Sequence, residues 1–221
     1  AAVDSVLFGR QGAAASLPNG SVVLDCSTIA PSTAVAAAER LRRQGVSYID
    51  APVTGGTEGA RAGTLTVLAG GDAEALERVR PLLEIIGGTV HHFGAVGRGQ
   101  QVKAVNQVLV AGSYAAVAEA MALGTRLGLP MQEVVAALSS GAAGSWALRN
   151  RADGMLAGRY PLGFRLSLHH KDLGIALKEA DSVQLTLPIC NLVQQQEAEL
   201  IGRGHGDEDV SALHRLFDSI S

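Results

Sequence analysis

The sequence predicts an α/β half followed by an all-helical half, and three observations support this fold class. Short apolar runs alternate with amphipathic helical patterns up to about residue 96. From Gly97 onward only helical patterns remain, separated by Gly and Pro. Hydrophobic residues make up 47% of the 221 residues and charged residues 18%, which supplies enough apolar side chains for packed cores. We expect one domain over residues 1–96 and a second over residues 97–221.

Strand patterns in the first half lie at residues 21–25, 48–53, 65–71 and 89–94. The first strand is followed by a turn and by Pro31, a residue favoured in the first turn of a helix, here expected over residues 32–45. A second helix is expected over residues 72–87, with Asp72 as its N-cap and Pro81 as a point of kinking or division. This alternation predicts a parallel or mixed sheet covered by helices.

The second half opens with a long apolar helix, expected over residues 99–128. Further helices are expected at residues 131–139, 145–157, 168–184, 188–203 and 209–219. A helix that is apolar on nearly every face is buried either within its own chain or against another subunit. The second alternative predicts a homo-oligomer.

Charge and composition argue against several classes of protein. The net charge is −3 and no basic stripe is present, so we do not expect a nucleic-acid partner. Polar residues interrupt the most apolar run, so we do not expect a membrane span; they are Asn106, Gln107, Ser113 and Glu119. The two cysteines, Cys26 and Cys190, are isolated, which favours a cytoplasmic protein without a metal site.

Lys103 stands at the start of the long helix, with Asn106 three positions on. A lysine near a helix start usually extends into solvent. Here Lys103, Asn106, Gln107 and Ser113 instead form a narrow polar stripe on an apolar helix, which indicates that they face a cleft. A lysine in such a water-poor place can act as a proton donor near neutral pH.

A second candidate site is the segment DAPVTGGTEGARAGTL, in which a strand ends and Thr54, Gly55 and Gly56 follow. Two adjacent glycines leave backbone N–H groups unshielded, so that an anion can approach them. An ordinary turn is the simpler interpretation. The glycine-rich loop is nevertheless longer than a turn requires.

Other candidates lie in the second half. Lys171 and Asp172 are adjacent and form either a solvated ion pair or part of a site. His169 and His170 point to different sides of a helix, which favours structural or surface roles over metal binding. For Trp146 a core role is the simpler interpretation, and closure over a pocket is the alternative.

The sequence has no G-x-G-x-x-G turn of the kind that holds a dinucleotide pyrophosphate, and GRGQQ at residues 97–101 is only a partial match. Either no nucleotide binds, or the phosphate-binding part precedes residue 1.

Four ordered motifs resemble those of the β-hydroxyacid dehydrogenases, the family of 3-hydroxyisobutyrate dehydrogenase and tartronate semialdehyde reductase. They are DCSTIAPS, DAPVTGGTEGARAGTL, GRGQQVKAVNQ and GFRLSLHHKDLGIAL. The resemblance covers essentially the whole chain. It implies a remnant of a Rossmann-type NAD(P)-binding domain, then an all-α domain with a long interdomain helix, as in 6-phosphogluconate dehydrogenase. It also implies that roughly 70–90 residues, including the glycine fingerprint, precede residue 1.

The resemblance also implies roles for individual residues. Lys103 is implied to be the catalytic acid/base, with Asn106 orienting the substrate. Thr54, Gly55 and Gly56 match the family's S-G-G loop, which binds the substrate carboxylate; threonine keeps the hydroxyl, but its methyl group narrows the pocket. Cofactor-side roles are implied for three further residues, Ser27, Thr28 and Lys171. Asp172 is implied to support Lys171.

The expected activity is reduction of a short carboxylate-bearing aldehyde, or oxidation of the corresponding 3-hydroxy acid, with NAD or NADP. KAVNQ at residues 103–107 favours tartronate semialdehyde (2-hydroxy-3-oxopropionate) reductase over 3-hydroxyisobutyrate dehydrogenase. The absence of a histidine from the lysine motif argues against a 6-phosphogluconate dehydrogenase. The alternative from another class is a catalytically inert fragment that acts as a helical oligomerisation module.

Overall fold

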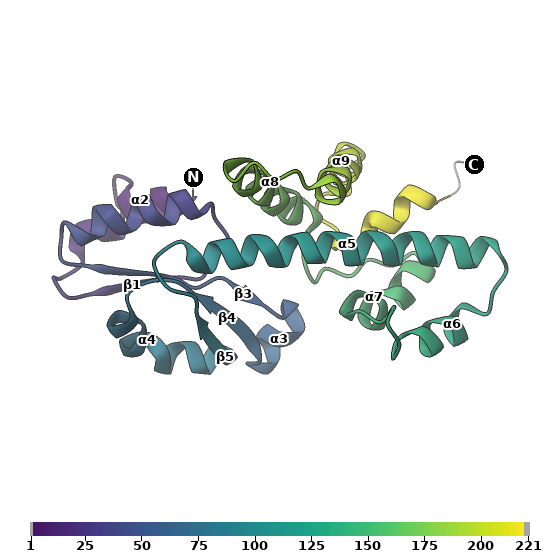
Figure 1. Ribbon diagram of the computed structural model, residues 1–221, viewed down its shortest axis with the longest axis horizontal. Coiled ribbons are helices and arrows are strands. Elements are labelled where there is room, and N and C mark those ends of the chain that lie inside the picture. Colours follow the sequence, from purple (N-terminus) through teal and green to yellow (C-terminus); the bar gives the residue numbers. More distant parts are fainter. Residues whose placement is uncertain (1, 219–221) are drawn as a thin grey trace. The chain divides into compact units, whose positions relative to one another are not determined.

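The computed structural model describes residues 2–218, which form two compact units, one up to Asn106 and one from Gln107 onward. The division lies within α5, a continuous helix over Arg98–Arg126 (Figure 1). The sequence places the domain boundary at residue 96, just before α5 begins. That boundary stays a prediction.

The first unit is built on a mixed set of strands. β1 (Val22–Asp25) and β2 (Ser47–Asp50) pair in parallel. β4 (Leu65–Ala69) lies between β3 (Val53–Thr54), which is antiparallel to it, and β5 (Gly87–His92), which is parallel to it. A bridge between Asp50 and Gly70 connects the end of β2 to the end of β4.

Helices cover both faces of these strands, and α2 and α4 lie on opposite sides (Figure 1). The bounds are α1 Ala2–Phe8, η1 Ala13–Ser16, α2 Pro31–Arg42, α3 Gly56–Ala62 and α4 Ala73–Ile86. As predicted, Pro31 occupies the first turn of α2, and the Asp72 side chain caps α4 by accepting the Ala75 N–H at 2.9 Å. Pro81 lies inside α4 without dividing it.

Two apolar clusters fill the first unit. One contains Leu76 and Leu83 of α4 with Ile49 and Val67 of the strands. The other contains Leu41 of α2 with residues of α1 and β2. Burial of large aliphatic side chains of this kind stabilises each layer by about 1.5–3 kcal/mol per side chain.

The first turn of α5 is held on the sheet by Asp50, whose side chain is fully buried. Its Oδ1 accepts the Gly97 N–H at 2.7 Å and its Oδ2 accepts the Gln100 N–H at 2.9 Å. Burial raises the pKa of the Asp50 carboxyl, and these two N–H groups oppose that rise. A methyl group at Gly99 would lie 2.8 Å from Asp50 Oδ2, so this turn requires glycine there.

The second unit is helical. After its part of α5 come α6 (Met131–Leu138), α7 (Trp146–Leu156), α8 (Leu166–Ser182), α9 (Pro188–Gly202) and η2 (Val210–Phe217). The last predicted helix, residues 209–219, is a 3-10 helix in the structure, and residue 219 lies outside the described part of the chain. α8 packs on α9, and η2 contacts α7, α8 and α9.

α5 is long and apolar enough to cross a membrane by length and composition, with an 18-residue window of mean hydropathy 1.4. A core helix of a soluble protein passes the same test. The polar residues along this helix therefore do not exclude a membrane span by themselves. That the protein has no membrane partner stays a prediction.

Replacing Asp50 tests the attachment of α5. In Asp50→Asn the amide oxygen can still accept one backbone N–H, but the amide nitrogen faces the other N–H donor. We expect the free energy of unfolding in urea at pH 7 to fall by about 1–3 kcal/mol. Asp4→Asn, which alters an exposed ion pair with Arg40, is the control and should change it by less than about 1 kcal/mol. Equal stability of the two variants would contradict the role of Asp50.

Candidate active site

The loop after β1 carries Ser27 and Thr28, and the side chains of Asp25 and Gln100 hydrogen-bond to its backbone. Asp25 Oδ1 accepts the Ser27 N–H at 2.8 Å, and Asp25 Oδ2 accepts the Tyr48 hydroxyl at 2.5 Å. The Gln100 side chain donates to Ser27 O at 2.8 Å and accepts the Ile29 N–H at 3.1 Å. The loop therefore has a fixed backbone at the carboxyl end of a parallel strand, where doubly wound sheets bind dinucleotides.

Cys26 lies in the same loop and is exposed, whereas Cys190 is buried. Partial burial and the neighbouring Asp25 carboxylate raise the pKa of the Cys26 thiol. Neither cysteine forms a disulfide. Within residues 2–218, no three or more His, Cys, Asp or Glu side chains gather in a way that could hold a metal ion.

Thr54 ends β3, and Gly55 and Gly56 follow with φ angles of 131° and 67°. Both angles lie in the region that favours glycine. The expectation of a long glycine-rich loop here is wrong, because α3 begins at Gly56. A short helix was missed because the four glycines at residues 55, 56, 59 and 63 lower helix propensity.

Lys103 lies in the second turn of α5 and is only 9% exposed. Its Nζ donates to Val53 O at 2.9 Å, the carbonyl immediately before Thr54. The structure therefore brings the lysine ammonium to the strand that leads into the diglycine turn. Asn106, one turn further along α5, is half-buried in the same unit.

Lys171 and Asp172 lie on α8 in the second unit, and their side chains differ in exposure. Asp172 is 3% exposed and Lys171 50% exposed, with Nζ 2.9 Å from Asp172 Oδ1. The Gln107 side chain donates to Asp172 Oδ2 at 2.7 Å. The pair is thus not a fully solvated one, because the carboxylate is buried and held by α5.

A buried His169–Glu197 pair lies beside this arrangement, and sequence reasoning did not find it. Both side chains are fully buried, and His169 Nδ1 lies 2.5 Å from Glu197 Oε1. His169 Nε2 faces Gln107 O at 3.4 Å, so both ring nitrogens face oxygen atoms. The expectation of a structural role for His169 agrees with this placement. The pairing could not be predicted from the sequence around His169, because Glu197 lies 28 residues away on another helix, α9.

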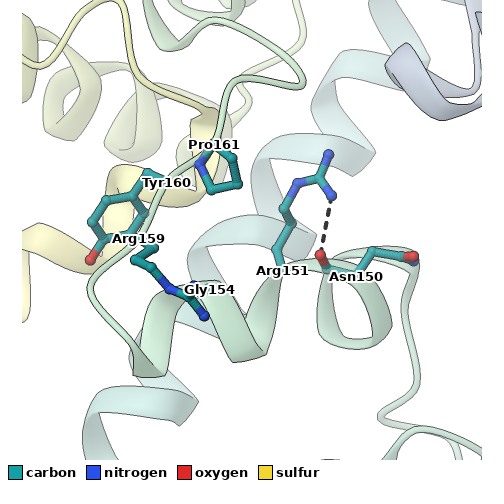
Figure 2. A pocket seen from close by; sticks show the side chains of 6 residues that line it. All are labelled: Asn150, Arg151, Gly154, Arg159, Tyr160 and Pro161. Atoms are coloured by element: carbon teal, nitrogen blue, oxygen red, sulfur yellow. Dashed lines mark hydrogen bonds between the residues drawn. The ribbon is translucent and has the colours of Figure 1, made fainter.

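A pocket of about 650 Å³ lies in the second unit and is shown in Figure 2. Its lining residues are Asn150, Arg151, Gly154, Arg159, Tyr160 and Pro161. No residue of the candidate site lines it. Arg151 is engaged already, because its guanidinium lies 4.5 Å from the ring centroid of Trp146 and its Nε 3.3 Å from buried Asp209 Oδ1.

Trp146 is the first residue of α7 and is 39% exposed. The expectation that its side chain lies in the core is therefore wrong. The indole is covered on one side by Arg151 instead. Tyr160 lines the pocket, and its hydroxyl lies 3.2 Å from His214 Nδ1. Burial raises the pKa of the Tyr160 phenol to about 12.

Comparison with known families matches both halves of the chain. Residues 1–94 match the family described as the NAD-binding domain of 6-phosphogluconate dehydrogenase. Residues 97–217 match the family described as NAD-binding of NADP-dependent 3-hydroxyisobutyrate dehydrogenase.

Among curated relatives, the chain is 39% identical over 98% of its length to an NAD-dependent L-serine dehydrogenase of Pseudomonas aeruginosa, of which it covers 75%. It is 37% identical over 97% of its length to a 3-hydroxyisobutyrate dehydrogenase of the same organism, of which it covers 75%. It is 36% identical over 98% of its length to a 2-hydroxy-3-oxopropionate reductase of Escherichia coli, of which it covers 74%.

A crystal structure of a 3-hydroxyisobutyrate dehydrogenase from Salmonella typhimurium superimposes with a TM-score of 0.90 at 32% identity. The superposition covers 97% of this chain and 75% of that one. The predicted fold class is confirmed by this similarity and by the two family matches.

Replacing Gly55 tests the diglycine turn. In Gly55→Ala the backbone must keep a φ of 131°, and the new methyl group would lie 3.1 Å from Leu65 Cδ2. We expect a loss of about 1–3 kcal/mol in the free energy of unfolding, measured in urea.

Gly112→Ala is the matched control, because a methyl group there meets nothing within 4 Å and the residue lies within α5. It should leave stability unchanged or raise it by about 0.5–1 kcal/mol. A Gly55→Ala protein as stable as this control would rule out strain in the turn.

Proposed function

Since the chain belongs to the β-hydroxyacid dehydrogenase family of NAD- or NADP-dependent oxidoreductases, we propose that it interconverts a short 3-hydroxy acid and its semialdehyde. The best candidate reaction is reduction of 2-hydroxy-3-oxopropionate (tartronate semialdehyde). The observation that carries the proposal is the 2.9 Å hydrogen bond from Lys103 Nζ to Val53 O, beside the diglycine turn.

Lys103 is the catalytic acid/base in this proposal. In the reductive direction its ammonium gives a proton to the oxygen of the developing alkoxide, and in the oxidative direction the amine takes the proton back. Its burial excludes bulk water as a competing proton donor. The hydrogen bond to Val53 O limits the positions that Nζ can take before substrate binds.

The backbone N–H groups of Gly55 and Gly56, with the Thr54 hydroxyl, hold the substrate carboxylate. Their short side chains allow the anion to approach the backbone closely. Asn106, one turn beyond Lys103 on the same helix, orients the substrate next to the lysine. These residues lie in one compact unit, so their relative positions do not depend on the second unit.

The residues of this chain suit the nicotinamide and ribose parts of the cofactor. Ser27 and Thr28 lie in a fixed loop at the carboxyl end of β1, and their hydroxyls suit the polar nicotinamide and ribose groups. No pyrophosphate-binding glycine turn occurs in residues 1–221. When bound, the reduced cofactor supplies the hydride. Lys171 of the second unit is assigned to cofactor binding in this proposal, and Asp172, whose Oδ1 lies 2.9 Å from Lys171 Nζ, supports it.

The choice among substrates rests on residues near Lys103. KAVNQ at residues 103–107 favours the 2-hydroxy-3-oxopropionate reaction, and 3-hydroxyisobutyrate is the alternative substrate. The methyl group of Thr54 narrows the pocket where a serine would leave room. We further propose a homo-oligomer, because α5 exposes large apolar side chains such as Val105, Leu109 and Leu123. A cytoplasmic location is proposed from the two isolated cysteines. A protein that only assembles and turns nothing over is the competing function.

Removing the lysine tests the catalytic proposal. In the complete natural protein, Lys103→Ala should lower kcat/KM by about 10²–10⁴-fold and leave NADH or NADPH binding within about threefold. Lys103→Arg should lower kcat/KM to a similar extent, because a guanidinium keeps its proton at working pH. Lys178→Ala, which removes an exposed lysine, is the control and should keep full activity. Wild-type turnover by Lys103→Ala would refute the assignment.

A comparison of two aldehydes tests the substrate. We expect kcat/KM for 2-hydroxy-3-oxopropionate to exceed that for the semialdehyde of 3-hydroxyisobutyrate by about 10-fold or more, because a pocket that hydrogen-bonds a hydroxyl discriminates against a methyl group. Thr54→Ser should reduce this ratio by widening the pocket. A reversed ratio favours the 3-hydroxyisobutyrate reaction, and no turnover of either aldehyde favours the assembly module.

A further inference from the structure

Gln100 connects the first turn of α5 to the loop after β1 through both ends of one carboxamide. Its Nε2 donates to Ser27 O at 2.8 Å, and its Oε1 accepts the Ile29 N–H at 3.1 Å. The residue is 1% exposed, so water does not compete for either hydrogen bond. Thr28, the residue enclosed between these two contacts, is one of the two hydroxyl residues assigned to the cofactor.

The backbone of Gln100 is fixed independently of its side chain. Its N–H donates to Asp50 Oδ2 at 2.9 Å, and Asp50 Oδ1 accepts the Gly97 N–H at 2.7 Å. Three residues further along the helix, Lys103 Nζ is bonded to Val53 O. One helical turn is therefore attached to β2 by its backbone, to the loop after β1 by Gln100, and to β3 by Lys103.

Only a carboxamide of this length meets the requirements of the loop. One carbonyl and one N–H of the loop backbone need a donor and an acceptor from the same side chain. Glutamate lacks the donor, methionine lacks both groups, and asparagine is one methylene shorter. The side chain thus holds residues 27–29 in one conformation before any ligand arrives, which lowers the ordering cost of binding.

We propose that Gln100 is a positioning residue that orders the Ser27–Thr28 loop for the nicotinamide cofactor and sets it in register with Lys103. This inference rests on the proposed function. In it Gln100 touches neither substrate nor cofactor, and it acts through the loop backbone.

The test compares Gln100→Met with Gln101→Met in the complete natural protein. Methionine preserves the volume of the buried side chain and removes both hydrogen bonds. Gln101 is the neighbouring residue of the same type, and it accepts a hydrogen bond from exposed Arg98. Three quantities are measured: the Kd of NADH and NADPH by fluorescence, the pH profile of kcat, and hydrogen–deuterium exchange of residues 26–31 without cofactor.

For Gln100→Met we expect a cofactor Kd raised by about tenfold, from the loss of two neutral hydrogen bonds. Exchange should rise in residues 26–31 but not in α4, and the pH profile should be unchanged because Lys103 remains. Gln101→Met should match wild type in all three. An unchanged Kd with unchanged exchange overturns the proposal. A rise in exchange throughout the first unit also overturns it, because it indicates a purely structural role.

These results separate the two proposals. Cofactor binding and hydrogen–deuterium exchange do not require turnover. They therefore test the role of Gln100 even if the protein reduces neither aldehyde. Conversely, a normal Kd in Gln100→Met together with loss of activity in Lys103→Ala overturns the role of Gln100 and leaves the proposed reaction intact. Failure of the wild-type protein to bind either cofactor overturns the role of Gln100.

Discussion

The buried carboxylate of Asp50 fixes where the long helix α5 begins on the sheet of the first unit. One oxygen accepts the N–H of Gly97, which immediately precedes α5, and the other accepts the N–H of Gln100, a first-turn donor without a partner within the helix. A helix is rigid over one turn, so fixing Gln100 also fixes the position from which the Lys103 side chain extends. Displacement of this turn would move the loop contact of Gln100 and the β3 contact of Lys103 together.

The two lysines assigned to the site are held in different ways. Lys103 is nearly buried, and its Nζ donates to the neutral backbone carbonyl of Val53. Lys171 is half exposed and lies against the buried carboxylate of Asp172. The two side chains therefore differ both in burial and in the oxygen atom that Nζ contacts, and the proposed roles of proton transfer and cofactor contact are assigned to residues in different environments.

The sequence was most informative where the signal is local. Alternating apolar runs predicted strands in the right places, but the single strand expected at residues 48–53 is divided into β2 (Ser47–Asp50) and β3 (Val53–Thr54). Pro31 and Asp72 marked helix starts as the structure has them. The apolar surroundings of Lys103 predicted its burial, because a solvated lysine needs a polar face. The short helix α3 was missed because glycine content suggested a loop.

The contacts that position the site were out of reach of such patterns. Gln100 bonds to residues 71 and 73 positions away, and Asp50 to residues 47 and 50 positions away. Neither spacing matches a helical or strand period, so no window of sequence contains both partners. The same holds for His169 and Glu197.

The exposed Cys26 lies within the loop that the Gln100 contacts order, while Cys190 is buried. The chain therefore carries one accessible thiol, through which a maleimide fluorophore could report directly on the state of that loop in solution.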